Sequence, residues 1–265
     1  MISPPNSVSE TAAVPSSPGS GAASPSPYPT RPGQRLEESP VAVVRPGVLG
    51  YHQAWALQRE VVARRQAGHG PDVLFLLEHP RVYTLGRRAD RGHILFDDDA
   101  LADRGIEVVE VDRGGDVTYH GPGQLVGYPV FRLASLRGVM AYVRALEEVL
   151  IRTVATYGIT AERVDGLTGV WVGDAKLGAI GVRVASRGVT SHGFALNVAS
   201  DLTDFTGIVP CGIQDRGVCS LASLGVDTTV AEVADRVQAA VTEVFGATLE
   251  PTTLDALGLT TKAAP

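Results

Sequence analysis

Residues 169–184 of this 265-residue chain read GVWVGDAKLGAIGVRV, and this stretch decides the fold. The apolar runs on either side of Gly173-Asp174 have the composition of strands, and this dipeptide is typical of a tight turn. The stretch therefore predicts a β-hairpin. A third strand is predicted at Val189–Val198, after the turn at Ser186-Arg187-Gly188. Strands that pair with their neighbours along the chain favour a mixed sheet over a purely parallel one.

Helices and further strands are predicted on both sides of this centre. Helical spacing of apolar residues predicts helices at 51–67 (ended by Gly68), from 139 to about 154 with Glu147 and Glu148 off the apolar face, and from Thr228 or Thr229 to Gly246. Thr229 and Glu232 have the spacing of a capping box. Short strands are predicted at Val73–Leu77, at Val82–Leu85 as its neighbour, at Ile106–Val111 and at Val117–Tyr119. Strands interleaved with a few helices predict an α/β (α+β) fold, with a mixed sheet flanked by helices.

The composition changes sharply near residue 40. Met1–Pro40 is dominated by Ser, Pro, Ala and Gly, and such a segment buries too little apolar surface to order itself. We expect residues 1–40 to form a disordered leader, residues 41–250 to form one folded catalytic domain, and residues 251–265 to form a weakly structured tail.

The overall composition excludes several classes of function. The net charge is −6, so the chain lacks the basic surface that nucleic acid or an anionic membrane attracts. No apolar run is long enough for a membrane span, and the amino terminus lacks a basic region followed by an apolar one. The two cysteines, Cys211 and Cys219, do not suggest a disulfide framework. We therefore expect a cytoplasmic globular protein.

Two reactive residue types occur in glycine-rich surroundings. Lys176 precedes Leu177-Gly178-Ala179-Ile180-Gly181, and Cys211 lies between Pro210 and Gly212. A thiol attacks as its thiolate, which a neighbouring cation stabilises, and a desolvated lysine supplies that charge and also carries protons. This pair predicts acyl transfer through a covalent thioester. Cys211 and Cys219 have no second pair with zinc spacing, so we expect no metal and no cofactor.

A third glycine-rich segment, at residues 113–124, reads RGGDVTYHGPGQ. It places Arg113, His120 and Gln124 beside backbone that a substrate can approach closely, which suits a cradle for a carbonyl, an amide or a phosphate. A tight turn between two strands is the alternative. The segment is not a nucleotide-binding fingerprint, because it lacks both common glycine patterns.

Several of these segments together resemble the lipoyl(octanoyl) transferases. The resemblance covers roughly residues 41–246 and is carried by Glu78-His79-Pro80, Tyr83–Arg87, the segment 113–124, Gly169–Val172, Lys176–Arg183, His192–Val198 and Ile208–Ile213. It implies the fold of biotin and lipoate ligases, with a smaller second sheet beside the main one. It also implies a cytoplasmic enzyme of lipoate biosynthesis that moves an octanoyl group from octanoyl-acyl carrier protein to a lysine of a lipoyl domain.

The resemblance also implies roles for particular residues. Cys211 would be the acyl-thioester nucleophile, and Lys176 would lower its pKa. The substrate would be lined by Arg113, Gly114, Gly115, Asp116, Val117, Thr118, Tyr119, His120, Ala179, Ile180, Gly181, Gly193, Phe194 and Ala195. The chain departs from the family at Asp116, where Gln is usual, and in the stretch Ala185–Ser191.

The implied partners are the acyl carrier protein as donor, and as acceptors the lipoyl domains of 2-oxoacid dehydrogenase complexes and the glycine cleavage H protein. Arg81, Arg87 and Arg88 are candidate contacts for these acidic partners. Three alternatives stay open. They are an ATP-dependent lipoate or biotin ligase on the same fold, a cysteine hydrolase using Cys211 with His120 or His192, and an inactive acyl-binding protein.

Overall fold

The computed structural model describes residues 40–133, 139–209 and 216–261. Its helices are α1 (Tyr51–Gln66), α2 (Asp98–Arg104), α3 (Val139–Ala155) and α4 (Val230–Phe245). The strands of the larger sheet are β1 (Val41–Val48), β2 (Val73–Glu78), β6 (Gln124–Val130), β7 (Glu162–Val164), β8 (Leu167–Val172), β9 (Ala175–Val184), β10 (Thr190–Asn197), β11 (Gly217–Val218) and β12 (Leu249–Thr252). The smaller sheet contains β3 (Val82–Leu85), β4 (Glu107–Glu110) and β5 (Val117–His120).

The larger sheet is mixed, as the sequence predicts. Its strand order is β12-β1-β2-β6-β10-β9-β8-β7, and β11 pairs with β9. The predicted hairpin is the antiparallel pair β8–β9, and the predicted third strand is β10, which runs antiparallel to β9. β1 lies parallel to both β2 and β12.

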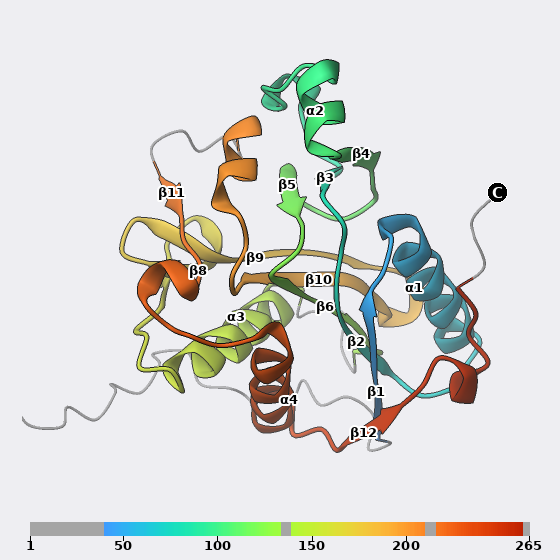
Figure 1. Ribbon diagram of the computed structural model, residues 1–265. Coiled ribbons are helices and arrows are strands. Elements are labelled where there is room, and N and C mark those ends of the chain that lie inside the picture. The colour runs from blue at the N-terminus through green and yellow to red at the C-terminus, as the bar shows by residue number, and fades with distance from the viewer. Residues whose placement is uncertain (1–39, 134–138, 210–215, 262–265) are drawn as a thin grey trace, which may run out of the picture. The chain divides into compact units, whose positions relative to one another are not determined.

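Helices cover both faces of this sheet, as Figure 1 shows, with α3 and α4 on one face and α1 on the other. The alternation of side chains along β2 produces the two layers. Leu74 and Leu76 pack with α3 and α4, whereas Val73, Phe75 and Leu77 pack with α1. Because both faces of the strand are covered, β2 reads in the sequence as an unbroken apolar run.

The helix ends follow the sequence signals. The Thr229 hydroxyl and the Glu232 carboxylate form the predicted capping box at the start of α4. Gly68 follows α1 with φ +83°, and Gly246 ends α4 with φ +64°, a conformation that glycine adopts without strain. None of the described helices is long and apolar enough to cross a membrane.

The predicted neighbour of β2 lies elsewhere. β3 (Val82–Leu85) does not pair with β2 but forms the centre of the smaller sheet, between β4 and β5. Both edges of β2 are already occupied, by β1 and by β6, so no edge is left for β3. The smaller sheet has its own apolar core, which includes Tyr83, Leu85 and Tyr119.

The structure contains elements that the sequence patterns did not indicate. They are β1, β6, β7, β11, β12 and the short helix α2. The tail expected to be weakly structured begins inside β12, which pairs with β1, and Leu259 beyond it is buried against the core beneath α1. The sequence does not predict β12, because this strand is only four residues long and contains Pro251. Such an edge strand forms only when its neighbour supplies the hydrogen-bonding partners.

Candidate active site

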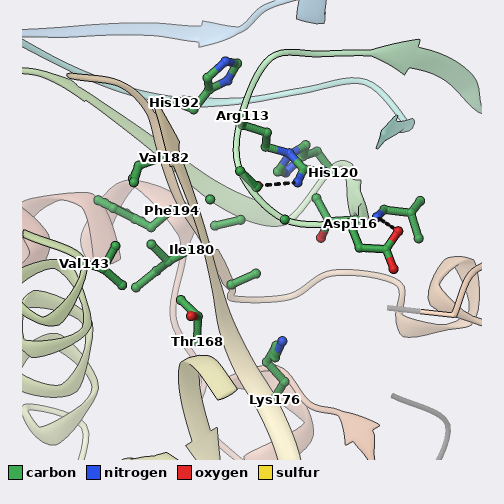
Figure 2. A pocket seen from close by; sticks show the side chains of 18 of the residues that line it. Arg113, Asp116, His120, Val143, Thr168, Lys176, Ile180, Val182, His192 and Phe194 are labelled. Atoms are coloured by element: carbon green, nitrogen blue, oxygen red, sulfur yellow. Dashed lines mark hydrogen bonds between the residues drawn. The ribbon is translucent and has the colours of Figure 1, made fainter. Parts of the chain in front are cut away.

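A cavity of about 480 Å³ lies where β9 and β10 meet the glycine-rich loop 113–116, β5 and the start of α3. Figure 2 shows Lys176 and His192 at opposite ends of its labelled residues. The sequence-predicted site residues that line it are Arg113, Gly114, Gly115, Asp116, Val117, Thr118, His120, Lys176, Ala179, Ile180, Gly181, Gly193, Phe194 and Ala195. Cys211 lies outside the described residues.

Strand register brings two of the predicted walls together. Residues 179–181 of β9 pair with residues 193–195 of β10, so that Gly181 lies opposite Gly193 and Ile180 opposite Phe194. The Phe194 ring fills the space above Gly127, where a Cβ atom would lie 2.1 Å from the ring. The two predicted walls, residues 179–181 and residues 193–195, are therefore adjacent on neighbouring strands of one sheet.

The glycine-rich loop is held against β9. The Gly114 amide donates to the Val182 carbonyl (3.0 Å), and a Cβ at Gly181 would lie 3.1 Å from the Gly114 carbonyl oxygen. The buried Arg113 guanidinium donates to the carbonyl and to the hydroxyl of Thr84, at 2.6 and 2.8 Å. Arg113 thus fastens the loop to the smaller sheet in addition to lining the cavity.

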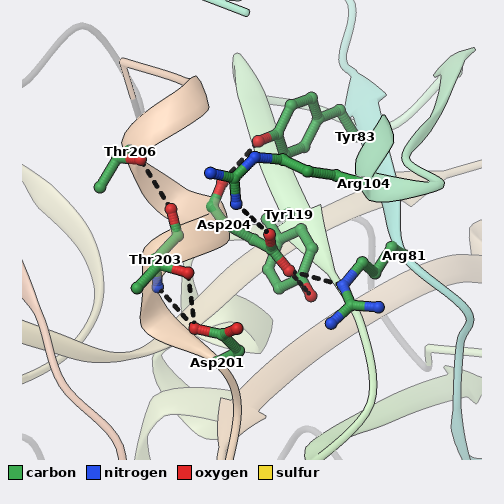
Figure 3. A network of polar contacts seen from close by, with 8 residues as sticks. All are labelled: Arg81, Tyr83, Arg104, Tyr119, Asp201, Thr203, Asp204 and Thr206. Carbon is green, nitrogen blue, oxygen red and sulfur yellow. Dashed lines mark hydrogen bonds and ion pairs between the residues drawn. The ribbon is translucent and has the colours of Figure 1, made fainter. Parts of the chain in front are cut away.

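Tyr119 is the predicted lining residue that the structure places elsewhere. Its ring packs against Tyr83 and Phe205, and its hydroxyl donates to the Asp204 carboxylate (2.8 Å) in the core of the smaller sheet. Figure 3 shows this network, in which Asp204 also pairs with Arg81 and Arg104. Tyr119 therefore fixes the segment around Asp204 and does not line the cavity.

The same network engages one of the three candidate docking arginines. Arg81 is paired with Asp204, whereas Arg87 and Arg88 are exposed, and Arg88 also lines the cavity. Asp116, at the position where Gln is usual in the resembling family, accepts a hydrogen bond from the Val117 amide and contacts His93 Nδ1 at 2.7 Å.

Lys176 is buried at the cavity end nearest β8 and β11. Its Nζ lies 4.8 Å from the centre of the Trp171 ring. The chain contains only two lysines, Lys176 and Lys262, among 23 Lys and Arg residues. Unlike arginine, lysine can release its proton when its surroundings favour the neutral form, so the residue type at position 176 suits proton transfer.

Cys219 behaves as a structural thiol. It is buried in the core beside α3, and burial raises its pKa to about 11. Its backbone amide donates to the Lys176 carbonyl (3.1 Å), which ties β11 to β9. A thiol that ionises so weakly is a poor nucleophile near neutral pH.

The cavity histidines are neutral and engaged by neighbours. Burial lowers the pKa of His120 to about 3, and its Nδ1 lies 2.7 Å from the Gln124 side-chain oxygen. Burial also lowers the pKa of His192, whose Nε2 lies 2.7 Å from the Asp112 carboxylate. His192 pairs with Val182, six residues along β9 from Lys176, which corresponds to about 20 Å of strand. Each of these histidines is thus held by a side chain of the described residues, Gln124 or Asp112.

Several lining residues were not identified from the sequence. Gln124, His192 and Arg88 also line the cavity and were named from the sequence as a cradle residue, a possible base and a partner contact. The lining residues that were not named are Tyr51, Tyr128, Val139, Met140, Val143, Gly166, Leu167, Thr168, Val182, Asn197, Phe205 and Val218. Val139 and Val143 carried the helical pattern of α3, which marks an apolar face but not what that face covers. Met140 lies next to Val139 and outside the helical pattern, and it is 60% exposed at the start of α3. An apolar residue off the apolar face was the one sequence signal that this end of α3 lines a cavity.

The buried histidines predict a specific loss of stability in acid. Burial lowers the pKa of His79 to about 4 and that of His120 to about 3, against 6.5 for a free histidine. Below about pH 6.5 the unfolded chain therefore binds protons that the folded chain does not, and the free energy of unfolding falls as the pH falls towards 4. Between its unfolded and its folded pKa, each histidine lowers the free energy of unfolding by on the order of 1.4 kcal/mol for each unit of pH.

Urea denaturation at several pH values between about 7 and 5 measures this slope. His79→Gln should flatten it, whereas the matched change at the half-exposed His52 should not. An unchanged slope in His79→Gln would contradict the assignment.

Comparison with known proteins shows the family to which the chain is related. The family model described as the lipoyl protein ligase A/B catalytic domain matches residues 50–242. An octanoyltransferase of Chloroflexus aggregans is 54% identical over 203 residues, which cover 75% of this chain and 92% of that protein. An octanoyltransferase of Mycolicibacterium smegmatis is 52% identical over 214 residues, covering 78% of this chain and 90% of that one.

A solved structure supports the fold. A bipartite lipoate protein ligase from Thermoplasma acidophilum, studied with its E2 lipoyl domain, superimposes with a TM-score of 0.64 at 18% identity, covering 82% of this chain and 87% of that one. The family model matches well over half of the chain, and the two relatives each cover about three quarters of it. The chain therefore belongs to the octanoyltransferases, acyltransferases within the lipoyl protein ligase A/B catalytic-domain family.

Proposed function

We propose that this octanoyltransferase takes its acyl group from octanoyl-acyl carrier protein, holds it as a thioester on Cys211, and delivers it to a lysine of a lipoyl domain. The observation that carries the proposal is the cavity itself. Its walls at Ile180, Val182 and Phe194 are apolar, and it ends at the buried Lys176. An alkyl chain gains about 0.8 kcal/mol for each CH₂ that it buries on such walls.

In the first half of the reaction, the Cys211 thiolate attacks the carbonyl carbon of the donor thioester. The carrier thiolate then leaves and takes up a proton, and one thioester replaces another at nearly equal free energy. The positive charge of Lys176 favours the thiolate, and its Nζ can supply the proton to the departing sulfur.

In the second half, the neutral amine of the acceptor lysine attacks the acyl-Cys211 carbonyl. The Cys211 thiolate leaves, an amide forms, and the extra proton on the new amide nitrogen passes to Lys176. Because an amide is more stable than a thioester, this step needs no nucleotide. Backbone amides of the walls at residues 179–181 and 193–195 are candidates to stabilise the oxyanion in both halves.

The proposed partners are macromolecular. Relatives named octanoyltransferase and the fold shared with a lipoate ligase studied with its E2 lipoyl domain support lipoyl domains as acceptors. The lipoyl domains of 2-oxoacid dehydrogenase complexes and the glycine cleavage H protein are the acceptors we propose. The exposed Arg87 and Arg88, beside the cavity, are candidates for steering acidic partners to it.

An ATP-dependent ligase on the same fold is the alternative function. The two differ in one requirement, because a ligase must adenylate a free acid whereas the transferase uses an acyl group that is already activated. With octanoyl-carrier protein as donor, we expect octanoylation of a lipoyl domain at the same rate with and without ATP. Free octanoate should give no product under either condition. Product from octanoate and ATP, with none from the carrier thioester, would establish the ligase instead.

A further inference from the structure

Strand β8 lies directly beside Lys176. Trp171 on β8 is the cross-strand partner of Lys176 on β9, and its ring centre lies 4.8 Å from Nζ. The Trp171 side chain is 1% exposed. A cation above an aromatic face is attracted to it, and the attraction strengthens when water is excluded.

The backbone of β8 approaches the lysine closely at Gly169. A Cβ there would lie 2.6 Å from the Gly178 carbonyl oxygen and 3.4 Å from Lys176 Cε. Gly169 has φ +125°, a conformation that other residues rarely adopt. Glycine is needed here because any side chain would clash with the Gly178 carbonyl oxygen, whereas the lysine stem lies at ordinary van der Waals distance.

A buried carboxylate holds this part of β8 in place. Glu147 on α3 is fully buried, and its carboxylate accepts a hydrogen bond from the Gly169 amide (3.1 Å). The same carboxylate pairs with Arg144 at 2.7 Å and with Arg163 at 3.0 Å, which compensates the cost of burying its charge. The sequence placed Glu147 off the apolar face of its helix, and tertiary contacts bury it nonetheless.

We propose that Trp171 is a positioning residue for Lys176, which holds the ammonium group at the end of the cavity. This inference rests on the proposed function, in which Lys176 moves protons. A lysine side chain has four rotatable methylene groups and loses much entropy when it is fixed. The Trp171 ring attracts Nζ to one place, and Gly169 lets β8 pack against the Gly178 carbonyl of β9 beside the lysine stem.

The test compares substitutions that keep or remove the aromatic face. Trp171→Phe keeps a weaker face and should retain kcat within about threefold, whereas Trp171→Leu removes it and should lower kcat about tenfold. The KM for octanoyl-carrier protein should stay within about twofold in both variants, because Trp171 does not line the cavity. A purely structural role would lower activity in proportion to the loss of folded protein, and would leave kcat per folded molecule unchanged.

Two matched controls separate this contact from others like it. The other tryptophan of the chain, Trp55, carries the Arg59 guanidinium 4.9 Å from its ring centre, and Trp55→Phe should leave kcat unchanged. Arg216 lies 5.3 Å from the Trp171 ring centre and also pairs with Asp174, and Arg216→Ala should leave kcat unchanged as well. If kcat falls as much in Arg216→Ala as in Trp171→Leu, the effect of Trp171 acts through Arg216 and not through Lys176. That result would overturn the proposal.

A spectroscopic measurement decides the matter even if Trp171→Leu folds poorly. In a Trp55→Phe background, Trp171 is the only tryptophan, so its fluorescence reports on the two cations beside it, Lys176 and Arg216. Replacing Lys176 by Met in that background should change the intensity or the wavelength of this emission, while near-identical thermal unfolding shows that the fold is kept. Unchanged emission would contradict the contact.

The outcomes also separate this inference from the proposed function. If Lys176→Ala keeps full activity, the proposed role of the lysine fails. If Lys176→Ala is inactive while Trp171→Leu keeps kcat within about twofold, the role of the lysine stands and that of Trp171 fails.

Discussion

Cys211→Ser should not form an octanoyl-enzyme. After the wild-type protein is mixed with octanoyl-carrier protein, intact-protein mass spectrometry should show one added octanoyl group that hydroxylamine removes. The serine variant should show none, because an alcohol near neutral pH is a far weaker nucleophile than a thiolate. Turnover should fall by a factor of at least about a thousand, as is usual when a covalent nucleophile is lost.

The second cysteine of the chain is the matched control. Cys219→Ser should gain the octanoyl group as the wild type does, because the buried Cys219 thiol, with its pKa raised to about 11, takes no part in the chemistry. An octanoyl group found on Cys219 would overturn the assignment of Cys211. Formation of product by Cys211→Ser at the wild-type rate would exclude a covalent route through this residue.

Lys176→Ala should lose turnover by about a hundredfold or more, which is the usual contribution of a general acid and base. The thiol should also become harder to ionise, since the variant lacks the cation that favours its thiolate. The rate of iodoacetamide alkylation, measured against pH in a Cys219→Ser background, should therefore rise at a higher pH than in the parent protein.

Lys176→Arg separates the two roles of the lysine. Arginine keeps the charge but does not release its proton in proteins. This variant should retain the alkylation profile of the parent more closely than Lys176→Ala does, yet remain nearly as slow in transfer to the lipoyl domain. An alkylation profile that is the same in all three proteins would show that another group activates the thiol.

Local sequence patterns were sufficient for much of the architecture. The turn at Gly173-Asp174 between two apolar runs predicted the β8–β9 pair, because a hairpin depends only on residues close together in the chain. The Thr229–Glu232 capping box marked the start of α4 for the same reason. The glycine-rich surroundings of Lys176 made it a candidate, and the resemblance to the transferase family supplied the lining residues of segment 113–120, of which Tyr119 lies elsewhere.

Long-range pairing was not predictable from such patterns. β3 was assigned to the wrong sheet because strand composition does not reveal which edges are free, and β6 already occupies the second edge of β2. Tyr119 was expected on the substrate, but the buried Asp204, 85 residues further along the chain, directs its hydroxyl into the smaller sheet. The sequence by itself predicted which residues are reactive and determined which short elements form. Only the tertiary structure decided that Glu147 of α3 holds β8 at Gly169, beside Lys176, because contacts between helices and strands depend on register and packing that no local pattern records.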